Sequence, residues 1–358
     1  MKPRCTHQRG FTLVEILVAM SIGIILLGGV IVVYSAQANT YKVVNSQAGT
    51  QNAENAITAL VTPIIRAAGF VGCSTILQPL TSNLNAGGPP PLGTLATPSM
   101  LFGYDANGTA GTGTLSIAQL NTANDNNAAN WTPNLDASLV SSVASGSDVL
   151  VMFGAIPGSQ PVAVASIPAG SSTLTVQDAT GLVAGQLAAV SDCGKTTLFN
   201  ITGVAGTTIT HAAGAGALAN TTSTFPVNYI NPALIPVQQT ALYVAQGQGG
   251  QSVLMLATYG GGVWTASPLV LGVDTMQLLY GIGANGVVSQ YVPASSSLVT
   301  ASTAVYSVRL AFLIEGQPGS AGANNRTSFP VLGTTVNVPQ DTRLRHVYEM
   351  TVNLRNGS

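Results

Sequence analysis

The hydrophobic and polar positions divide this chain into two unequal parts. Residues 16–34 form a run of nineteen residues without a charge, and a single acid, Glu15, stands immediately before it. Roughly 20 apolar residues, at ~1.5 Å rise per residue, cross the ~30 Å hydrocarbon core of a bilayer. The segment 11–34 is therefore predicted to span a membrane as one helix.

The helical pattern continues beyond this apolar segment. Gly28 and Gly29 lower the helix propensity, so the helix is expected to bend or melt there. Pro63 is expected to kink the helix or to start a new segment at Thr62. Gly69 is expected to end the helix. The second half is predicted to pack against a globular domain through one apolar face. The residues of that face are Ile57, Leu60, Val61, Ile64, Ile65 and Ala68.

The rest of the chain has the pattern of a β-rich domain. The interval 79–146 has little periodicity and two loop-like stretches, so it is predicted to be a flexible insertion. From Asp148 onward, short β-branched runs alternate with Gly, Pro and Asn turns, which is typical of antiparallel sheet. These runs are 148–153, 161–166, 173–177, 186–191, 196–202, 207–210, 241–245, 253–259, 275–280, 287–292, 304–314 and 346–354.

The predicted fold class is α+β, with a long N-terminal helix (11–68) packed on a β-rich antiparallel head (69–358). In the last strand, Tyr348, Met350, Val352 and Leu354 are expected to share one face. The strand candidates exceed what one small sheet needs, which leaves room for a second β subdomain in the middle of the chain.

Composition and charge narrow the class of protein. The 358 residues are 46% hydrophobic and only 6% charged, with a net charge of −1. Three of the eleven basic residues lie in the first ten positions, which leaves eight basic against twelve acidic residues, or −4, in the remainder. This balance argues against nucleic-acid binding through a broad basic patch. The basic residues precede the apolar helix, so the positive-inside rule places the large domain across the membrane.

The junction between the leader and the helix carries a specific motif. Residues 10–15, Gly-Phe-Thr-Leu-Val-Glu, follow a basic leader (1–10) and resemble the type IV prepilin signature. The resemblance implies that a peptidase cuts after Gly10, that Phe11 becomes a methylated N-terminus, and that Glu15 serves assembly. Cleavage there leaves the apolar helix on the mature protein, unlike a secretory signal. The alternative is an uncleaved signal anchor with an accidental glutamate.

Cleavage would remove Cys5 and leave two cysteines, Cys73 and Cys193. An even pair in a translocated domain is most simply a disulfide, and two unpaired buried thiols are the alternative. The bond would close a loop of about 120 residues, worth on the order of 4–5 kcal/mol in the chain-entropy model.

Further segments resemble one subgroup, the PilW-type minor pilins. These segments are 67–73, 147–152, 191–193 with 198–202, 272–274 leading to 279–281 with Gly286 and Tyr291, 343–348 and 352–356. The resemblance implies a structural subunit of the inner membrane, with a periplasmic head, that later joins a cell-surface pilus. Its implied partners are the prepilin peptidase/methyltransferase, other minor pilins, the major pilin and a tip adhesin. Twitching motility, adhesion and DNA uptake are the implied activities.

Short motifs that resemble catalytic or cofactor sites are present, but the residues around them do not fit such sites. Residues 281–286 fit G-x-G-x-x-G, but a strand pattern follows where a dinucleotide site needs a helix, so a hairpin turn is predicted. Asp105 begins like a calcium loop that lacks its glycine and its closing glutamate, so only a weak, irregular ion site stays open there. The sequence shows no metal-ligand spacing and no nucleophile elbow. We therefore expect no catalytic residues, metal or cofactor.

Three alternatives to a minor pilin remain at this stage. A type II secretion pseudopilin shares the processing and the helix. A membrane-anchored β-rich binding module would never polymerise and would retain Arg9 and Gly10. A periplasmic hydrolase would need a cleft with convergent polar groups.

Overall fold

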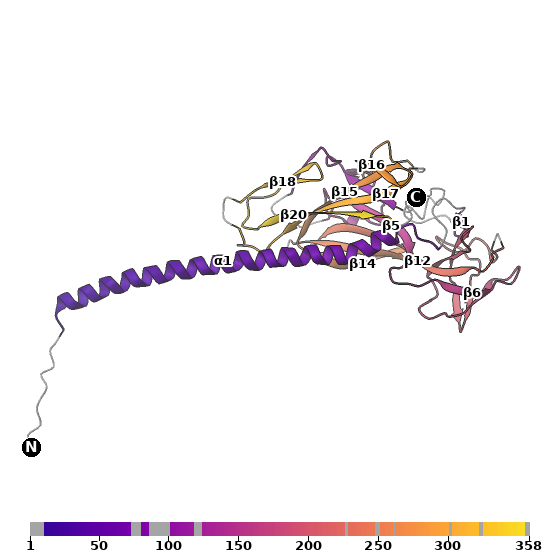
Figure 1. The fold of residues 1–358 in the computed structure, drawn as a ribbon, viewed down its shortest axis with the longest axis horizontal. Coiled ribbons are helices and arrows are strands. Elements are labelled where there is room, and N and C mark those ends of the chain that lie inside the picture. Colours follow the sequence, from indigo (N-terminus) through magenta and orange to yellow (C-terminus); the bar gives the residue numbers. More distant parts are fainter. Residues whose placement is uncertain are drawn as a thin grey trace, which may run out of the picture.

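The computed structural model describes residues 11–72, 80–85, 101–117, 124–225, 228–247, 251–260, 262–300, 303–321 and 325–354. One long helix, α1 (Leu13–Ala67), projects from one end of a β-rich head (Figure 1). This arrangement confirms the predicted α+β fold. The helix is continuous through Gly28, Gly29 and Pro63, so no new segment begins at Thr62. It ends before Gly69, which has φ 74°, a conformation that glycine adopts without a steric penalty.

The head contains three sheets in its described part. The largest has thirteen strands and a branched order, in which β12 pairs with β5, β6, β8 and β13. Its strands are β1 (Leu80–Ser82), β2 (Leu101–Ala106), β4 (Trp131–Thr132), β5 (Val149–Ala155), β6 (Val162–Ser166), β7 (Thr173–Val176), β8 (Leu187–Ser191), β9 (Thr196–Asn200), β10 (Gly203–Ala205), β11 (Thr208–Thr210), β12 (Ala233–Gln246), β13 (Ser252–Gly260) and β14 (Val263–Leu271).

The two smaller sheets come mainly from the C-terminal third. An antiparallel sheet has the order β16-β15-β17-β20, with β15 (Val273–Ala284), β16 (Val287–Val292), β17 (Val305–Glu315) and β20 (Arg345–Asn353). A three-stranded sheet joins β18 (Ser328–Val331), β19 (Thr334–Asn337) and β3 (Thr114–Ser116). Short 3-10 helices lie at Ala128–Asn130 and Val140–Ser142.

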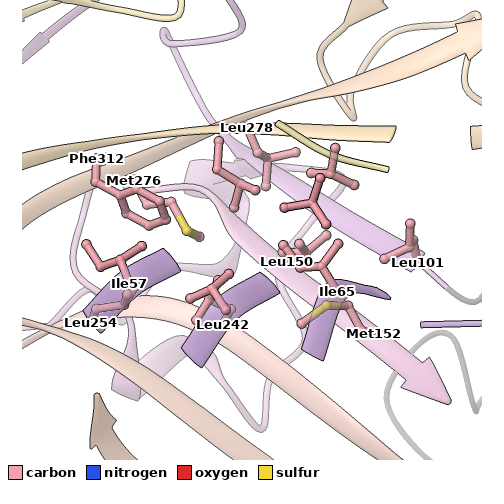
Figure 2. Packing of buried hydrophobic residues seen from close by; sticks show 14 of the residues in the cluster. Ile57, Ile65, Leu101, Leu150, Met152, Leu242, Leu254, Met276, Leu278 and Phe312 are labelled. Atoms are coloured by element: carbon pink, nitrogen blue, oxygen red, sulfur yellow. The ribbon is translucent and has the colours of Figure 1, made fainter. Parts of the chain in front are cut away.

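The main hydrophobic core lies where α1 meets both larger sheets. Ile57, Val61 and Ile65 of α1 are 0–1% exposed and belong to one cluster with side chains of β5, β12, β13, β15 and β17 (Figure 2). The helix contacts β14 of the large sheet and β20 of the four-stranded sheet. The second half of α1 therefore closes the core between the two sheets.

The predicted apolar face of the helix needs one correction. Leu60 is 42% exposed, whereas Ile57, Val61, Ile65 and Ala68 are buried. The buried row instead continues toward the N-terminus through Ser46 and Thr50. At this end the backbone of the head comes so close that a Cβ on Gly316 would lie 2.0 Å from Ser46 Oγ, so only small side chains fit.

The interval 79–146 also differs from the prediction of a flexible loop. The structure places β1, β2, β3 and β4 within it, and Leu101, Tyr104 and Trp131 are at most 5% exposed. These strands are only two to six residues long, too short for a recognisable period of two. Residues 86–100 and 118–123 lie outside the described part.

The middle of the chain adds a group of short strands to the thirteen-stranded sheet, so the possible second β subdomain is not a separate sheet. Strands β6, β7, β10 and β11 cover a separate cluster that includes Leu174, Phe199 and Ile209, each 0% exposed. In Figure 1 this region, marked by β6, lies at the end of the head away from the projecting helix.

Candidate assembly site

The first turn of α1 is closed by a reciprocal pair of side chains. Thr12 is the N-cap, and its Oγ1 accepts a hydrogen bond from the backbone N–H of Glu15 at 3.3 Å. Glu15 Oε2 in turn accepts from the Thr12 backbone N–H and from Thr12 Oγ1, both at 2.9 Å. This capping box satisfies helix donors that would otherwise be unpaired, and it fixes the Glu15 carboxylate at the start of the apolar segment.

The surface that follows Glu15 is apolar and uncovered. The most apolar 18-residue window of α1 has a mean hydropathy of 2.9, and none of it is buried against the head. By length and composition α1 is able to cross a membrane. Every residue from Leu13 to Gln37 is exposed, so about 25 residues, or ~37 Å of helix, are free of the head. Phe11, at the beginning of this segment, is 84% exposed.

Polar contacts supplement the apolar docking of the helix on β20. His346 Nδ1 lies 2.6 Å from Glu54 Oε1, and the Tyr348 hydroxyl hydrogen-bonds to Thr58 Oγ1. Tyr348, Met350 and Leu354 pack against the main core and Val352 belongs to it, which confirms their predicted common face. The helix is thus held to β20 by a row of alternate side chains.

The exit of the helix is joined to β5 through the backbone. The Gly69 N–H donates to Phe153 O at 2.8 Å, and the Ala155 N–H donates to Phe70 O at 2.7 Å. Between these bonds, a Cβ on Gly154 would lie 2.2 Å from the Ala67 carbonyl oxygen. The absence of a side chain at position 154 therefore allows the helix end to lie directly on the strand.

The predicted disulfide would join the segment that follows α1 to the turn after β8. Gly72 packs so closely on β8 that a Cβ there would lie 2.5 Å from Ser191 Cβ, and Cys193 has φ 66° in the turn after β8. The segment before Cys73 and the segment before Cys193 are therefore neighbours. Cys73 itself and Gly10 lie outside the described residues, so the disulfide and the cleavage point stay predictions.

A buried ion network fixes the beginning of β20. Arg345 is 8% exposed, and its guanidinium contacts Asp274 Oδ2 at 2.6 Å, Asp341 Oδ1 at 2.7 Å and Glu315 Oε2 at 3.5 Å. Arg343 adds a contact of 3.1 Å to Glu315 Oε1. Burial, reinforced by the Asp274 charge, raises the pKa of Glu315 to about 8. The network joins β15, β17 and β20 close to the docked helix.

A second buried carboxylate has a structural role as well. Asp148 is 2% exposed and accepts from the backbone N–H of Ala106 at 2.8 Å and of Leu278 at 2.9 Å, which ties β2 to β15. Burial, with a further contribution from the Asp105 charge, raises its pKa well above the usual range. Asp105 accepts from the backbone N–H groups of Ala294 and Ser295. In the described part of the chain no cluster of three or more His, Cys, Asp or Glu side chains could hold a metal.

Sequence reasoning missed two of these features. The spacing of Thr12 and Glu15 is the S/T-x-x-E signature of a capping box, which was available from the sequence. The Arg345 network was not, because its acids come from positions 274, 315 and 341, far apart along the chain.

Two protein families match this chain, one at its N-terminal helix and one in its C-terminal third. Residues 241–356 match the family described as type IV pilus-assembly protein W (PilW), and residues 5–31 match the prokaryotic N-terminal methylation motif. These matches confirm the resemblance to PilW-type, prepilin-like minor pilins. No match was found among curated proteins or among solved structures. The PilW match covers β13 to β20 and the end of β12 from Ala241, whereas β1 to β11 lie outside it.

Proposed function

We propose that this chain is a structural minor pilin, without enzymatic activity, that is processed by a prepilin peptidase and then takes part in type IV pilus assembly. The observation that carries the proposal is the uncovered apolar half of α1, with Glu15 held at its beginning. Such a surface needs a bilayer or other helices around it, because apolar area exposed to water is unfavourable. The two family matches support a pilus rather than an unrelated membrane anchor.

In this proposal the chain first enters the inner membrane with its head in the periplasm, as the basic leader implies. Cleavage after Gly10 would then free the amine of Phe11, to which the methyltransferase would transfer a methyl group. Glu15 uses Oε2 for the cap, and no hydrogen bond to its Oε1 occurs within the described residues. One carboxylate oxygen thus remains for the amine of a neighbouring subunit.

The magnitude of this contact indicates what it contributes. Two unit charges 4 Å apart attract by ~4 kcal/mol at an effective dielectric of 20 and by ~1 kcal/mol in water. Desolvation of both groups offsets part of the gain. The pair therefore sets the axial register of the incoming subunit, while packing of the apolar helices supplies most of the stability.

The proposed partners are the peptidase/methyltransferase, other minor pilins, the major pilin and a tip adhesin. The chain would help to prime pilus assembly and so serve twitching motility, adhesion or DNA uptake. Deletion should remove surface fibres. Intact fibres combined with lost exoprotein secretion would instead assign the chain to a type II secretion pseudopilus.

The direct test is to shear pili from cells that express variants of this subunit and to measure its ratio to the major pilin. N-terminal mass spectrometry reports processing in the same samples. Glu15→Val and Glu15→Gln should be cleaved and membrane-inserted but poorly incorporated, and Glu15→Asp should keep part of the wild-type ratio. Gly10→Val should accumulate as the uncut precursor. Normal cleavage of Gly10→Val would refute the processing, and wild-type incorporation of Glu15→Val would refute the docking role of the carboxylate.

A further inference from the structure

The turn after β2 carries a motif that the proposed function does not use. Asn107, Gly108 and Thr109 form the tripeptide Asn-x-Ser/Thr, the acceptor of N-linked glycans in chains that leave the cytoplasm. The tripeptide alone does not select a site, because it recurs along the chain. It also begins at Asn130, Asn200, Asn220, Asn325 and Asn356, the last of which lies outside the described residues.

The hydrogen bonds of the folded chain separate these candidates. Nδ2 of an asparagine carries two hydrogens, and an N-glycosidic bond replaces one of them with the anomeric carbon of a sugar. Buried Asn220 donates from Nδ2 to Asn200 O at 2.7 Å and to Ala212 O at 3.2 Å. Nδ2 of Asn325 also donates two bonds, at 2.8 and 2.9 Å. A glycan at either position would therefore remove a bond that the fold uses.

Among the described candidates, Asn107 and Asn130 are the exposed ones. Nδ2 of each donates one hydrogen bond within the described residues, from Asn107 to Ala129 O and from Asn130 to Asp125 Oδ2. One hydrogen thus remains for a sugar at both positions. The two differ in the residue two positions earlier, which is Asp105 before Asn107 and Ala128 before Asn130. A carboxylate there offers a transferase a charge-assisted hydrogen bond, which is stronger than a neutral one.

The turn at Asn107 has room for a glycan. The Thr109 N–H donates to Ala106 O at 3.1 Å, which closes a tight turn with Asn107 and Gly108 at its tip. A Cβ on Gly108, whose φ is 84°, would meet nothing within 4 Å. The tip therefore projects into open space.

The residues on either side of the acceptor are buried in the fold. Asp105 is 2% exposed and accepts from the backbone N–H groups of Ala294 and Ser295. Thr109 is 1% exposed and donates from Oγ1 to Ala106 O. An enzyme that reads both side chains can reach them only before β2 is packed into the head. The finished fold then covers the recognised residues and leaves Asn107 outside.

We propose that Asn107 carries an N-linked glycan, which is added to the translocated chain before the head folds. The donor is an oligosaccharide linked to a polyprenyl diphosphate. The bond from the anomeric carbon to the diphosphate oxygen breaks, a bond from that carbon to Asn107 Nδ2 forms, and the lipid diphosphate leaves. One proton of Nδ2 passes to a base of the transferase. The inference rests on the proposed transfer of the head across the membrane, and it is independent of cleavage and pilus assembly.

The first test is mass spectrometry of the full-length chain purified from its native host. Peptides that contain Asn107 should carry a glycan mass and release sugar fragment ions. Asn107→Gln should lose this glycan, whereas Asn130→Gln, the matched control at the other exposed candidate, should keep it. Thr109→Val removes the hydroxyl at nearly constant shape and should abolish the modification, and Thr109→Ser should retain it. Tryptophan fluorescence confirms that each variant is folded. An unmodified Asn107 in the wild type, or a glycan on the Thr109→Val protein, overturns the inference.

A second test addresses the order of events. Full-length chain made in a host without the transferase is mixed with native-host membranes, either folded or freshly diluted from urea. Only the urea-diluted chain should be modified, and Asp105→Asn should reduce its modification although folding plays no part there. Equal modification of the folded chain would refute recognition before folding.

The last comparison separates this inference from the proposed function. Gly10→Val should remain glycosylated, because the head crosses the membrane with or without cleavage. Protease added to spheroplasts reports the position of the head in the same cells. A head that the protease digests but that carries no glycan overturns the inference alone, whereas a protected, unmodified head overturns the proposed orientation together with the inference.

Discussion

The contact between Gly154 and the end of α1 gives the sharpest prediction for stability. A Cβ at position 154 would lie 2.2 Å from the Ala67 carbonyl oxygen and 3.2 Å from Ala68 Cα. Both are backbone atoms, so no side-chain rotation relieves the clash. To restore ordinary contact near 3.4 Å, the helix end must move by about 1 Å. We therefore expect Gly154→Ala to separate α1 from β5.

The cost can be worked out from the contacts that this movement breaks. Overpacking in a rigid site costs about 1–3 kcal/mol. The bonds from Gly69 N–H to Phe153 O and from Ala155 N–H to Phe70 O would lengthen as well, at about 0.5–1.5 kcal/mol each. The expected loss is thus about 2–6 kcal/mol, a large part of the ~5–15 kcal/mol that stabilises a typical domain.

Urea unfolding of the full-length protein in micelles measures this loss. Fluorescence follows Trp131 and Trp264, which both lie in the head. Gly49→Ala is a matched control of opposite sign, because a Cβ there meets nothing within 4 Å and alanine favours the helix by up to ~1 kcal/mol. Hydrogen exchange should accelerate at the amides of Gly69 and Ala155 in Gly154→Ala. An unchanged unfolding midpoint together with unchanged exchange would refute the reasoning.

Three further predictions concern other contacts. Cys73 and Cys193 should form a disulfide, so the mature protein should show no free thiol until it is reduced; Cα atoms more than ~7 Å apart would exclude the bond. Burial lowers the pKa of His211, whose ring nitrogens have no partner in the described residues, so the unfolded state takes up the proton first. Stability should therefore fall below pH 6.5, by up to ~1.4 kcal/mol per pH unit, and His211→Phe should flatten this dependence in urea titrations. Arg345→Met should cost about 3–5 kcal/mol because it leaves buried acids unpaired, whereas Arg309→Met, at an exposed pair, should cost at most ~1 kcal/mol; equal losses would contradict the difference in burial.

Features that are local in sequence were predictable. The apolar run, the strand runs from Asp148 onward and the hairpin at 281–286 each depend on neighbouring residues. In the hairpin, Asn285 and Gly286 have φ 52° and 78°, as a tight turn between β15 and β16 requires. The G-x-G-x-x-G motif is thus a turn, as its following strand pattern indicated.

Features that depend on distant partners were not predictable. Strand β14 was missed because Pro268 interrupts its pattern. The proline is tolerated because, among the described strands, β14 pairs with β13 alone, and Pro268 lies at a shift in their register. Ser46 and Thr50 are polar, so no apolar pattern marks them as buried, and the close approach of Gly316 to Ser46 appears only in the fold. Likewise, Gln238 of β12 lies between the residues that pair with β8 and those that pair with β13, and no local pattern in the sequence predicts this branching of the sheet.

The junction of α1 with β5 also determines how the molecule would carry a mechanical load. A pull on the projecting helix enters the head through the Ile57–Ile65 face, the contacts with β20 and the backbone bonds on either side of Gly154. Contacts spread along a helix are loaded together when the pull follows its axis, whereas a sideways pull would open them one after another. The head is therefore expected to resist axial tension best, and a Cys73–Cys193 bond would keep the helix exit tethered to β8 after the noncovalent contacts had failed.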